Sequence, residues 1–241
     1  MAKKRTIVGS ALTPTLLREL GAIDQFPPTP ADFKPDGNWV NAYRIWTCHG
    51  YRESGNEDVG SVRIQRTRDS NRTFTLSIHQ EVAQTDGVNS IIDGTIQCQN
   101  NQLASPVNWR LSSRFAAPGG EKMPELSSVD SGVTVEQAEN STSDWCLFEA
   151  VQRLAFDKQS SLSFNLLEGM RLPKLQHRLS YRGIHPMKTD EGNMPLHCFV
   201  QLGNGILPYE YWLDARHRLL AVTSMNKAYI LDEKAARITE R

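Results

Sequence analysis

Two carboxylates flank the most aromatic segment of the chain. Glu210 and Asp214 lie on either side of Tyr211 and Trp212. On a β-strand, residues four apart share one face and lie about 13 Å apart, whereas the two carboxyl groups of a glycosidase lie roughly 5 to 9.5 Å apart. The pair alone is therefore too widely spaced for glycoside hydrolysis. Glu210 with a carboxylate from another strand stays open as a catalytic acid, with Tyr211 and Trp212 as a platform for the sugar.

The other residues with catalytic or ligating side chains show no spacing typical of an active site. None of the 6 histidines belongs to an HExxH motif, and neither a glycine-rich phosphate loop nor a GxSxG nucleophile motif occurs. His79, His177 and His197 lie in predicted strands, so a zinc site assembled across strands stays open. The sequence predicts no catalytic residues, no metal ligands and no cofactor. It favours a non-enzymatic protein without excluding an enzyme.

The cysteines lie in apolar segments, and none belongs to a CxxC pair. They are Cys48, Cys98, Cys146 and Cys198. Cysteine in such a context behaves as a small buried hydrophobe, which predicts four buried side chains. Reduced thiols and disulfides both agree with this pattern, and four cysteines allow three complete pairings.

Charge and hydropathy limit the partners. The chain of 241 residues has 27 basic and 27 acidic side chains, so its formal net charge is zero. A neutral protein exerts no long-range attraction on nucleic acid, and we predict no nucleic-acid partner. No apolar run approaches the roughly 18 residues that cross a bilayer, so we predict no membrane-spanning segment.

The N-terminus permits two interpretations. A basic start followed by small and apolar residues is typical of an export signal, but Pro14, Arg18 and Glu19 interrupt it. We interpret residues 13–20 as a short helix and the prolines after it as an extended lead-in. The protein would be periplasmic or secreted with an export signal, and cytoplasmic otherwise. The predicted organisation is an N-terminal helix and proline-rich lead-in over residues 1–38 and a single antiparallel β domain over residues 39–241.

Beyond residue 39 the dominant period is two, which is typical of half-buried strands. The alternating segments lie near residues 39–49, 59–67, 73–79, 92–98, 107–115, 129–137, 162–168, 175–182, 196–202, 207–214, 218–225 and 228–232. Turn-rich stretches separate them, as in an antiparallel meander. The predicted fold is mainly β, with a large curved antiparallel sheet, a half-barrel or open barrel, and one inserted helix.

The inserted helix is predicted at residues 143–156. Ser143 or Asp144 would cap it. Leu147, Val151 and Leu154 recur at helical spacing and, with Phe148, form an apolar stripe. Glu149, Gln152 and Arg153 fall on the other side. We therefore predict that the helix is structural and that Glu149 is a solvated surface group.

The C-terminal half resembles a family of bacterial envelope proteins. The helix after a polar loop is followed by paired strands, by Leu207-Pro208-Tyr209-Glu210-Tyr211-Trp212-Leu213-Asp214, and by His217-Arg218-Leu219-Leu220-Ala221-Val222. Over roughly residues 140–232 this order resembles DUF3108-like proteins, which have a curved sheet similar to that of LolA and LolB. The resemblance implies a concave apolar surface for a lipid-like ligand, and it implies no catalytic residues.

These observations lead to a hypothesis of ligand binding. A non-enzymatic β protein would hold a lipid or another apolar small molecule against its concave sheet. The predicted groove residues are Trp109, Leu111, Phe148, Phe164, Phe199 and Trp212. The alternative is a carbohydrate-binding or carbohydrate-active β-sandwich.

Overall fold

Alternation of apolar and polar residues gives strands over most of the chain. The computed structural model describes residues 26–48, 57–83, 89–116, 126–127, 140–159, 161–189 and 192–235. Within these ranges, 13 strands pair into one sheet. They are β1 (Trp39–Thr47), β2 (Glu57–Arg68), β3 (Thr73–Ala83), β4 (Asn89–Gln99), β5 (Pro106–Ala116), β6 (Leu126–Ser127), β7 (Ser141–Ser143), β8 (Ser161–Glu168), β9 (Leu172–Thr189), β10 (Gly192–Leu202), β11 (Tyr209–Leu213), β12 (Leu219–Thr223) and β13 (Lys227–Leu231). The predicted mainly antiparallel fold is confirmed.

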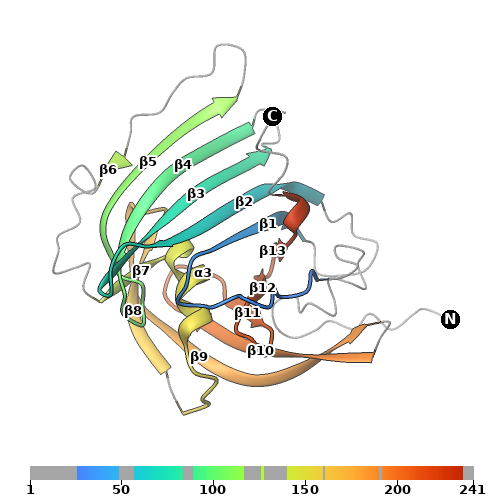
Figure 1. Ribbon diagram of the computed structural model, residues 1–241. Helices are drawn as coiled ribbons and strands as arrows, with labels where there is room; N and C mark the ends of the chain where they lie inside the picture. Colours follow the sequence, from blue (N-terminus) through green and yellow to red (C-terminus); the bar gives the residue numbers. More distant parts are fainter. Residues whose placement is uncertain are drawn as a thin grey trace.

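The sheet consists of two meanders that meet at β1 and β13 (Figure 1). Its strand order is β6-β5-β4-β3-β2-β1-β13-β12-β11-β10-β9-β8-β7. Every neighbouring pair is antiparallel except β7 and β8, which are parallel. Short connections join the sequential strands of each meander, except that α3 lies between β7 and β8. The pairing of β1 with β13, in contrast, joins strands from the two ends of the described chain.

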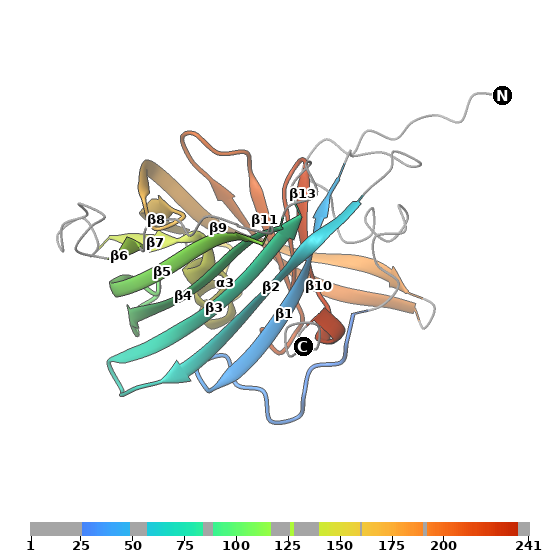
Figure 2. The ribbon, with the colours of Figure 1, turned by 90° about the horizontal axis from the view of Figure 1, so that it is seen from above.

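The sheet curls into a nearly closed barrel around helix α3 (Asp144–Arg153). Residues of β5, next to one edge of the sheet, contact β7 at the other edge. Figures 1 and 2 show the strands passing around the helix from both sides. The concave face expected from the sequence therefore holds a helix, which supplies much of the core.

Local sequence determines where α3 begins and ends. The Ser143 hydroxyl accepts a hydrogen bond from the Cys146 N–H at 3.2 Å and caps the first turn. Asp144 in the first turn and Arg153 in the last complement the helix dipole. Leu154 is extended, so the predicted helix at 143–156 continues three residues too far.

Glu149 corrects the prediction of a solvated helix face. Its side chain is 0% exposed, because the sheet surrounds α3 and buries every residue from Trp145 to Gln152. Its Oε1 atom accepts hydrogen bonds from the Nε atoms of Arg66 at 2.8 Å and Arg153 at 2.6 Å. The pairing compensates the desolvation of a buried carboxylate. Glu149 therefore ties the helix to β2.

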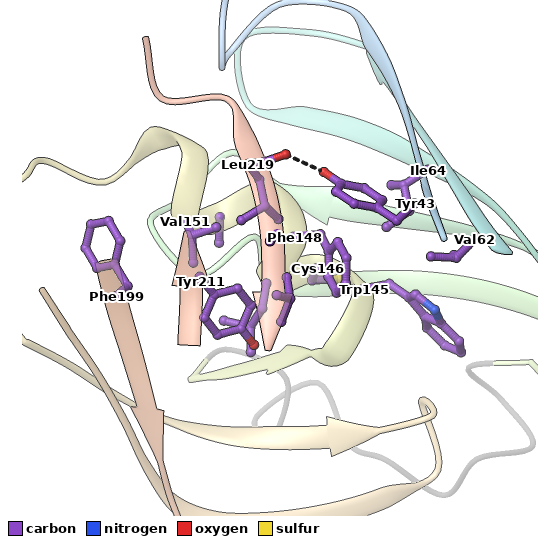
Figure 3. Packing of buried hydrophobic residues seen from close by; sticks show 14 of the residues in the cluster. Tyr43, Val62, Ile64, Trp145, Cys146, Phe148, Val151, Phe199, Tyr211 and Leu219 are labelled. Atoms are coloured by element: carbon purple, nitrogen blue, oxygen red, sulfur yellow. Dashed lines mark hydrogen bonds between the residues drawn. The ribbon is translucent and has the colours of Figure 1, made fainter. Parts of the chain in front are cut away.

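Aromatic rings pack α3 against the meeting point of the two meanders (Figure 3). The Phe148 ring lies edge-on to Tyr43 on β1 and to Tyr229 on β13, with ring centroids 5.2 and 5.3 Å apart. The Tyr43 hydroxyl donates a hydrogen bond to the carbonyl oxygen of Leu219 at 3.2 Å. All four cysteines are buried, as predicted.

One close backbone approach depends on a glycine in β2. Gly60 has a φ of +152°, and a Cβ there would lie 2.0 Å from the Glu81 carbonyl oxygen on β3. The ladder between β1 and β2 shifts register beside this position, between Ile45 and Trp46. Only glycine fits both the dihedral angle and the space.

Several predictions lie wholly or partly outside the described residues. The predicted N-terminal helix at 13–20 and the predicted strand at 129–137 lie outside the described residues. Between residues 116 and 140 the structure describes only β6.

Candidate functional site

All six side chains predicted to line a ligand groove are buried in one apolar core. Trp109 and Leu111 come from β5, Phe148 from α3, Phe164 from β8, Phe199 from β10 and Trp212 from β11. They do not line one cavity. Phe148 contributes to a cavity at the N-terminal end of α3, and Phe164 to a separate open hollow of about 420 Å³ beside His177. The other four line neither space. A role for any of the six in ligand binding stays a prediction.

Phe199 and Trp212 lie on opposite faces of the sheet. Phe199 pairs with Tyr211 across β10 and β11, so these two share a face, and Trp212 points the other way. The Phe199 ring packs against Tyr181 at 5.3 Å between centroids. Trp212 donates its Nε1–H to the Thr223 hydroxyl at 2.9 Å. The predicted groove residues are thus divided between two faces.

The aromatic segment of β11 lacks the exposed rings that a sugar platform needs. Tyr211 and Trp212 are each 2% exposed, and Glu210 is also buried. Asp214 accepts a hydrogen bond from the Thr29 hydroxyl and others from the backbone of its own turn. It therefore organises the connection to β12, and this segment gives no support to the carbohydrate alternative.

The cavity at the N-terminal end of α3 combines an apolar floor with polar walls. Its volume is about 160 Å³. Phe148, Leu166, Ile206 and Val222 supply apolar surface, and three tyrosines supply hydroxyl-bearing rings. The remaining lining residues are Asp144, Glu168, Gln201 and Lys227. We name this space the end cavity.

Strand register places the tyrosines around the end cavity. Tyr211 pairs with Val222, and Val222 pairs with Tyr229, so the three side chains form a row on one face of β11, β12 and β13. Tyr209 lies two residues before Tyr211 and therefore on the same face. The row faces α3, as the contact of Tyr229 with Phe148 shows.

Asp144 is a buried carboxyl group in the lining of the end cavity. Its Oδ2 atom accepts a hydrogen bond from the Gly169 N–H at 3.2 Å. Its Oδ1 atom is buried and has no hydrogen-bond partner among the described residues. Burial raises the pKa of this carboxyl from 3.8 to about 6, although the N–H groups of Gly169 and of Asp144 itself act in the opposite direction. At neutral pH the cavity therefore holds a carboxylate with unused accepting capacity.

The phenols around the end cavity stay protonated. Burial is the largest cause of a raised pKa at Tyr209, Tyr211 and Tyr229, and the negative charge of Asp144 contributes at all three. The Tyr211 hydroxyl donates a hydrogen bond to Gln201 Oε1 at 2.7 Å. Protonated phenols both donate and accept hydrogen bonds.

Two lysines balance the acidic groups near the end cavity. Lys174 pairs with Glu168 at 2.8 Å between Nζ and Oε1. The Lys227 ammonium lies 5.8 Å from the centre of the Tyr229 ring, within the range of a cation–π contact. The two lysine charges offset the charges of Asp144 and Glu168, so the formal charge of the residues around the cavity sums to about zero when both carboxyls are ionised.

Most residues of the end cavity carry no signal in the sequence that marks them as a site. Asp144 was assigned only as a possible helix cap and Tyr211 only as a possible sugar platform, while Glu168, Tyr209 and Tyr229 were not singled out. Tyr209 and Tyr211 share a face because they lie two residues apart on β11. Their approach to Asp144 depends on the pairing of strands far apart in sequence.

The described residues contain neither a candidate metal site nor a helix that could span a membrane. No group of three or more histidine, cysteine, aspartate or glutamate side chains among them could hold a metal ion. No described helix is long and apolar enough to cross a membrane.

Comparison with known proteins finds weak structural likeness. No family model and no curated protein matches the chain. The crystal structure of a beta-barrel-like protein of domain of unknown function DUF1849 from Brucella abortus is similar over 81% of this chain and 96% of that chain, with 8% identity and a TM-score of 0.44. The dehydratase domain from the CurF module of curacin polyketide synthase is similar over 95% and 87%, with 8% identity and a TM-score of 0.17. These values assign the chain to no family and carry no function to it.

Proposed function

We propose that this protein binds a small molecule in the end cavity, with an apolar body against Phe148 and one hydrogen-bond donor, a hydroxyl or amine, directed at Asp144. One observation carries the proposal: Asp144 lines a cavity, and its buried Oδ1 atom has no partner among the described residues. A buried polar atom without a partner is costly. A donor from a ligand would remove that cost.

The size of the end cavity sets the size of the ligand. An engineered apolar cavity of about 150 Å³ in another protein binds benzene, and the end cavity measures about 160 Å³. A single aromatic ring or a short alkyl chain therefore fits, and a complete acyl chain does not. The proposal narrows the lipid-like ligand expected from the DUF3108 resemblance to a small molecule or to one end of a larger one.

The walls favour a ligand with both apolar and polar surface. Phe148, Leu166 and Val222 supply apolar contact, while the protonated phenol of Tyr209 supplies a donor and an acceptor. An anionic ligand would meet the Asp144 carboxylate as a like charge. A neutral alcohol or a cationic amine meets it as a donor.

A matched ligand series tests these requirements. Benzylamine, benzyl alcohol, toluene and benzoate share one ring and differ in the attached group, and binding is measured by ligand-observed NMR. We expect benzylamine and benzyl alcohol to bind, toluene to bind more weakly and benzoate least. Because Asp144 deprotonates with a pKa of about 6, benzylamine binding should strengthen as the pH rises from 5 to 7.

Two pairs of variants locate the binding site. Asp144→Asn should weaken benzylamine binding about tenfold or more, the loss of a charge-assisted hydrogen bond, whereas Asp157→Asn, beyond the other end of α3, should not. Ile206→Trp should fill the end cavity and abolish binding, whereas Leu207→Trp, at an exposed neighbour outside the lining, should not. Equal binding of all four ligands, or unchanged binding to Asp144→Asn and Ile206→Trp, would refute the proposal.

A further inference from the structure

The thiols of Cys98 and Cys146 touch across the boundary between the helix and the barrel wall. Cys98 lies on β4 and Cys146 in the first turn of α3, and their Sγ atoms are 3.7 Å apart. Figure 3 shows Cys146 among the buried side chains. Both residues are 0% exposed. By contrast, the Sγ of Cys198 lies 3.7 Å from the carbonyl oxygen of Phe199, and the structure records no sulfur–sulfur contact for it.

We propose that Cys98 and Cys146 form a disulfide when the chain folds in an oxidising thiol environment, and that this bond fastens the N-terminal end of α3 to β4. The S–S bond is about 2.0 Å long, so each Sγ atom has to move by only about 0.8 Å, half the difference from the observed 3.7 Å. Small side-chain rotations suffice for such a movement. The other two cysteines would remain thiols.

The reaction is thiol–disulfide exchange with a low-molecular-weight disulfide such as oxidised glutathione. One thiolate attacks a glutathione sulfur, which gives a mixed disulfide and releases one glutathione thiol. The second cysteine then attacks its partner's sulfur and releases the other glutathione. Two cysteine thiols lose two protons and two electrons in total, and the glutathione disulfide is reduced to two thiols.

Burial determines when this exchange takes place. The contact lies inside the barrel, where neither an oxidant nor a reductant reaches the sulfurs, and burial raises the pKa of the Cys98 thiol well above its usual range. Oxidation should therefore occur during folding, and the finished disulfide should resist reduction until the protein unfolds. The folded protein retains the redox state in which it formed.

The position of the bond has a consequence for the end cavity. Cys146 lies in the same turn of α3 as Asp144 and Phe148, both of which line that cavity. A disulfide would limit movement of this turn away from the wall. The inference does not depend on the proposed function, because the bond is detected by mass whether or not any ligand binds.

Refolding with subsequent trapping tests the pairing. The reduced, unfolded chain is refolded in a reduced and oxidised glutathione buffer, denatured with N-ethylmaleimide present, and analysed by intact mass and peptide mapping. We expect two modified cysteines, Cys48 and Cys198, and a linked peptide pair that contains Cys98 and Cys146. Four modified cysteines, or a linkage to Cys48 or Cys198, would overturn the proposal.

Matched variants and thermal stability provide a second measurement. Cys98→Ser should yield three modified cysteines and no linked pair, whereas Cys198→Ser should keep the linked pair. The oxidised wild type should unfold roughly 10 °C above the reduced form, because the bond closes a loop of about 48 residues. An oxidised form that melts below the reduced one would contradict the geometry. If Cys98→Ser does not fold, the wild-type peptide map alone decides.

Discussion

Replacement of Glu149 by glutamine removes the negative charge that pairs with two arginines inside the barrel. Glu149 Oε1 bonds to Arg66 Nε at 2.8 Å and to Arg153 Nε at 2.6 Å, while Oε2 bonds to Arg153 Nη2 at 2.9 Å. The Arg66 side chain is 1% exposed, so its guanidinium cannot turn to water when the carboxylate is lost. Its remaining hydrogen bonds go to the neutral backbone carbonyls of residues 36 and 37 and to the Asn100 Oδ1 atom, and they do not neutralise its charge.

Loss of one partner of a buried ion pair costs about 3 to 5 kcal/mol, a large part of a typical folding free energy of about 5 to 15 kcal/mol. With an m-value of about 3 kcal/mol/M, the urea midpoint of Glu149→Gln should fall by roughly 1 to 1.7 M. Equilibrium unfolding followed by tryptophan fluorescence measures this shift.

Glu168→Gln is the matched control. Glu168 also pairs at 2.8 Å, with Lys174, but its side chain is 43% exposed. The same substitution there should change the free energy of unfolding by less than about 1 kcal/mol. If both variants shifted the midpoint by the same small amount, the buried pair would not stabilise the barrel and the argument would be wrong. In Arg66→Gln/Glu149→Gln the loss should be smaller than the sum of the single losses.

Three further predictions concern the helix, the end cavity and a close backbone approach. Phe148→Ala should lower the free energy of unfolding by about 3 to 5 kcal/mol, and an unchanged urea midpoint would show that the ring is not part of a tight core. The pKa of Asp144 in the folded protein is raised to about 6, so its stabilising contribution is full below about pH 4 and is lost as the pH rises through 6. The loss is at most about 3 kcal/mol in the free energy of unfolding. Asp144→Asn should therefore gain stability relative to the wild type between pH 4 and 7, and parallel pH profiles of the two proteins would refute this. Gly60→Ala should cost at least about 2 kcal/mol in thermal unfolding, because the new Cβ would lie 2.0 Å from the Glu81 carbonyl oxygen, whereas Gly169→Ala, where nothing lies within 4 Å, should cost about 1 kcal/mol.

The strands and the start of the helix could be predicted because local chemistry determines them. The alternation of apolar and polar residues along β3, β4 and β5 reflects one face toward the core and one face toward solvent. This alternation can be recognised within a single segment of the sequence. The capping hydroxyl of Ser143 marks the helix start in the same way. The helix end is less clear, because Leu154 and Phe156 remain apolar after the helix has ended and pack on the core as extended chain.

The environment of the helix could not be predicted from its own sequence. A stripe of apolar residues on a helix usually indicates one buried face and one solvent-exposed face. This pattern predicts that Glu149 is solvent-exposed. The closing of the sheet around α3 buries both faces, and the compensating charge comes from Arg66, 83 residues earlier. No local pattern relates these two residues.

The end cavity depends on long-range register in the same way. Tyr211 and Tyr229 become neighbours only through β12, and Asp144 reaches them from the helix. In its own segment, none of these three residues belongs to a motif that marks a binding site. A cavity whose lining residues come from strands and a helix far apart in sequence is therefore harder to predict than a motif within one loop.

The pairing of β1 with β13 has a consequence for folding during synthesis. Strands β1 to β5 can pair with their neighbours soon after they leave the ribosome, because each partner follows within a short connection. The second neighbour of β1, however, is Lys227–Leu231, almost the whole described chain later. Contacts of such separation form slowly, so one long edge of β1 should stay open until nearly all of the described chain has been made. Truncation before β13 should therefore leave two half-sheets with no shared ladder, and a nascent chain paused there would be the form most prone to association with a second copy.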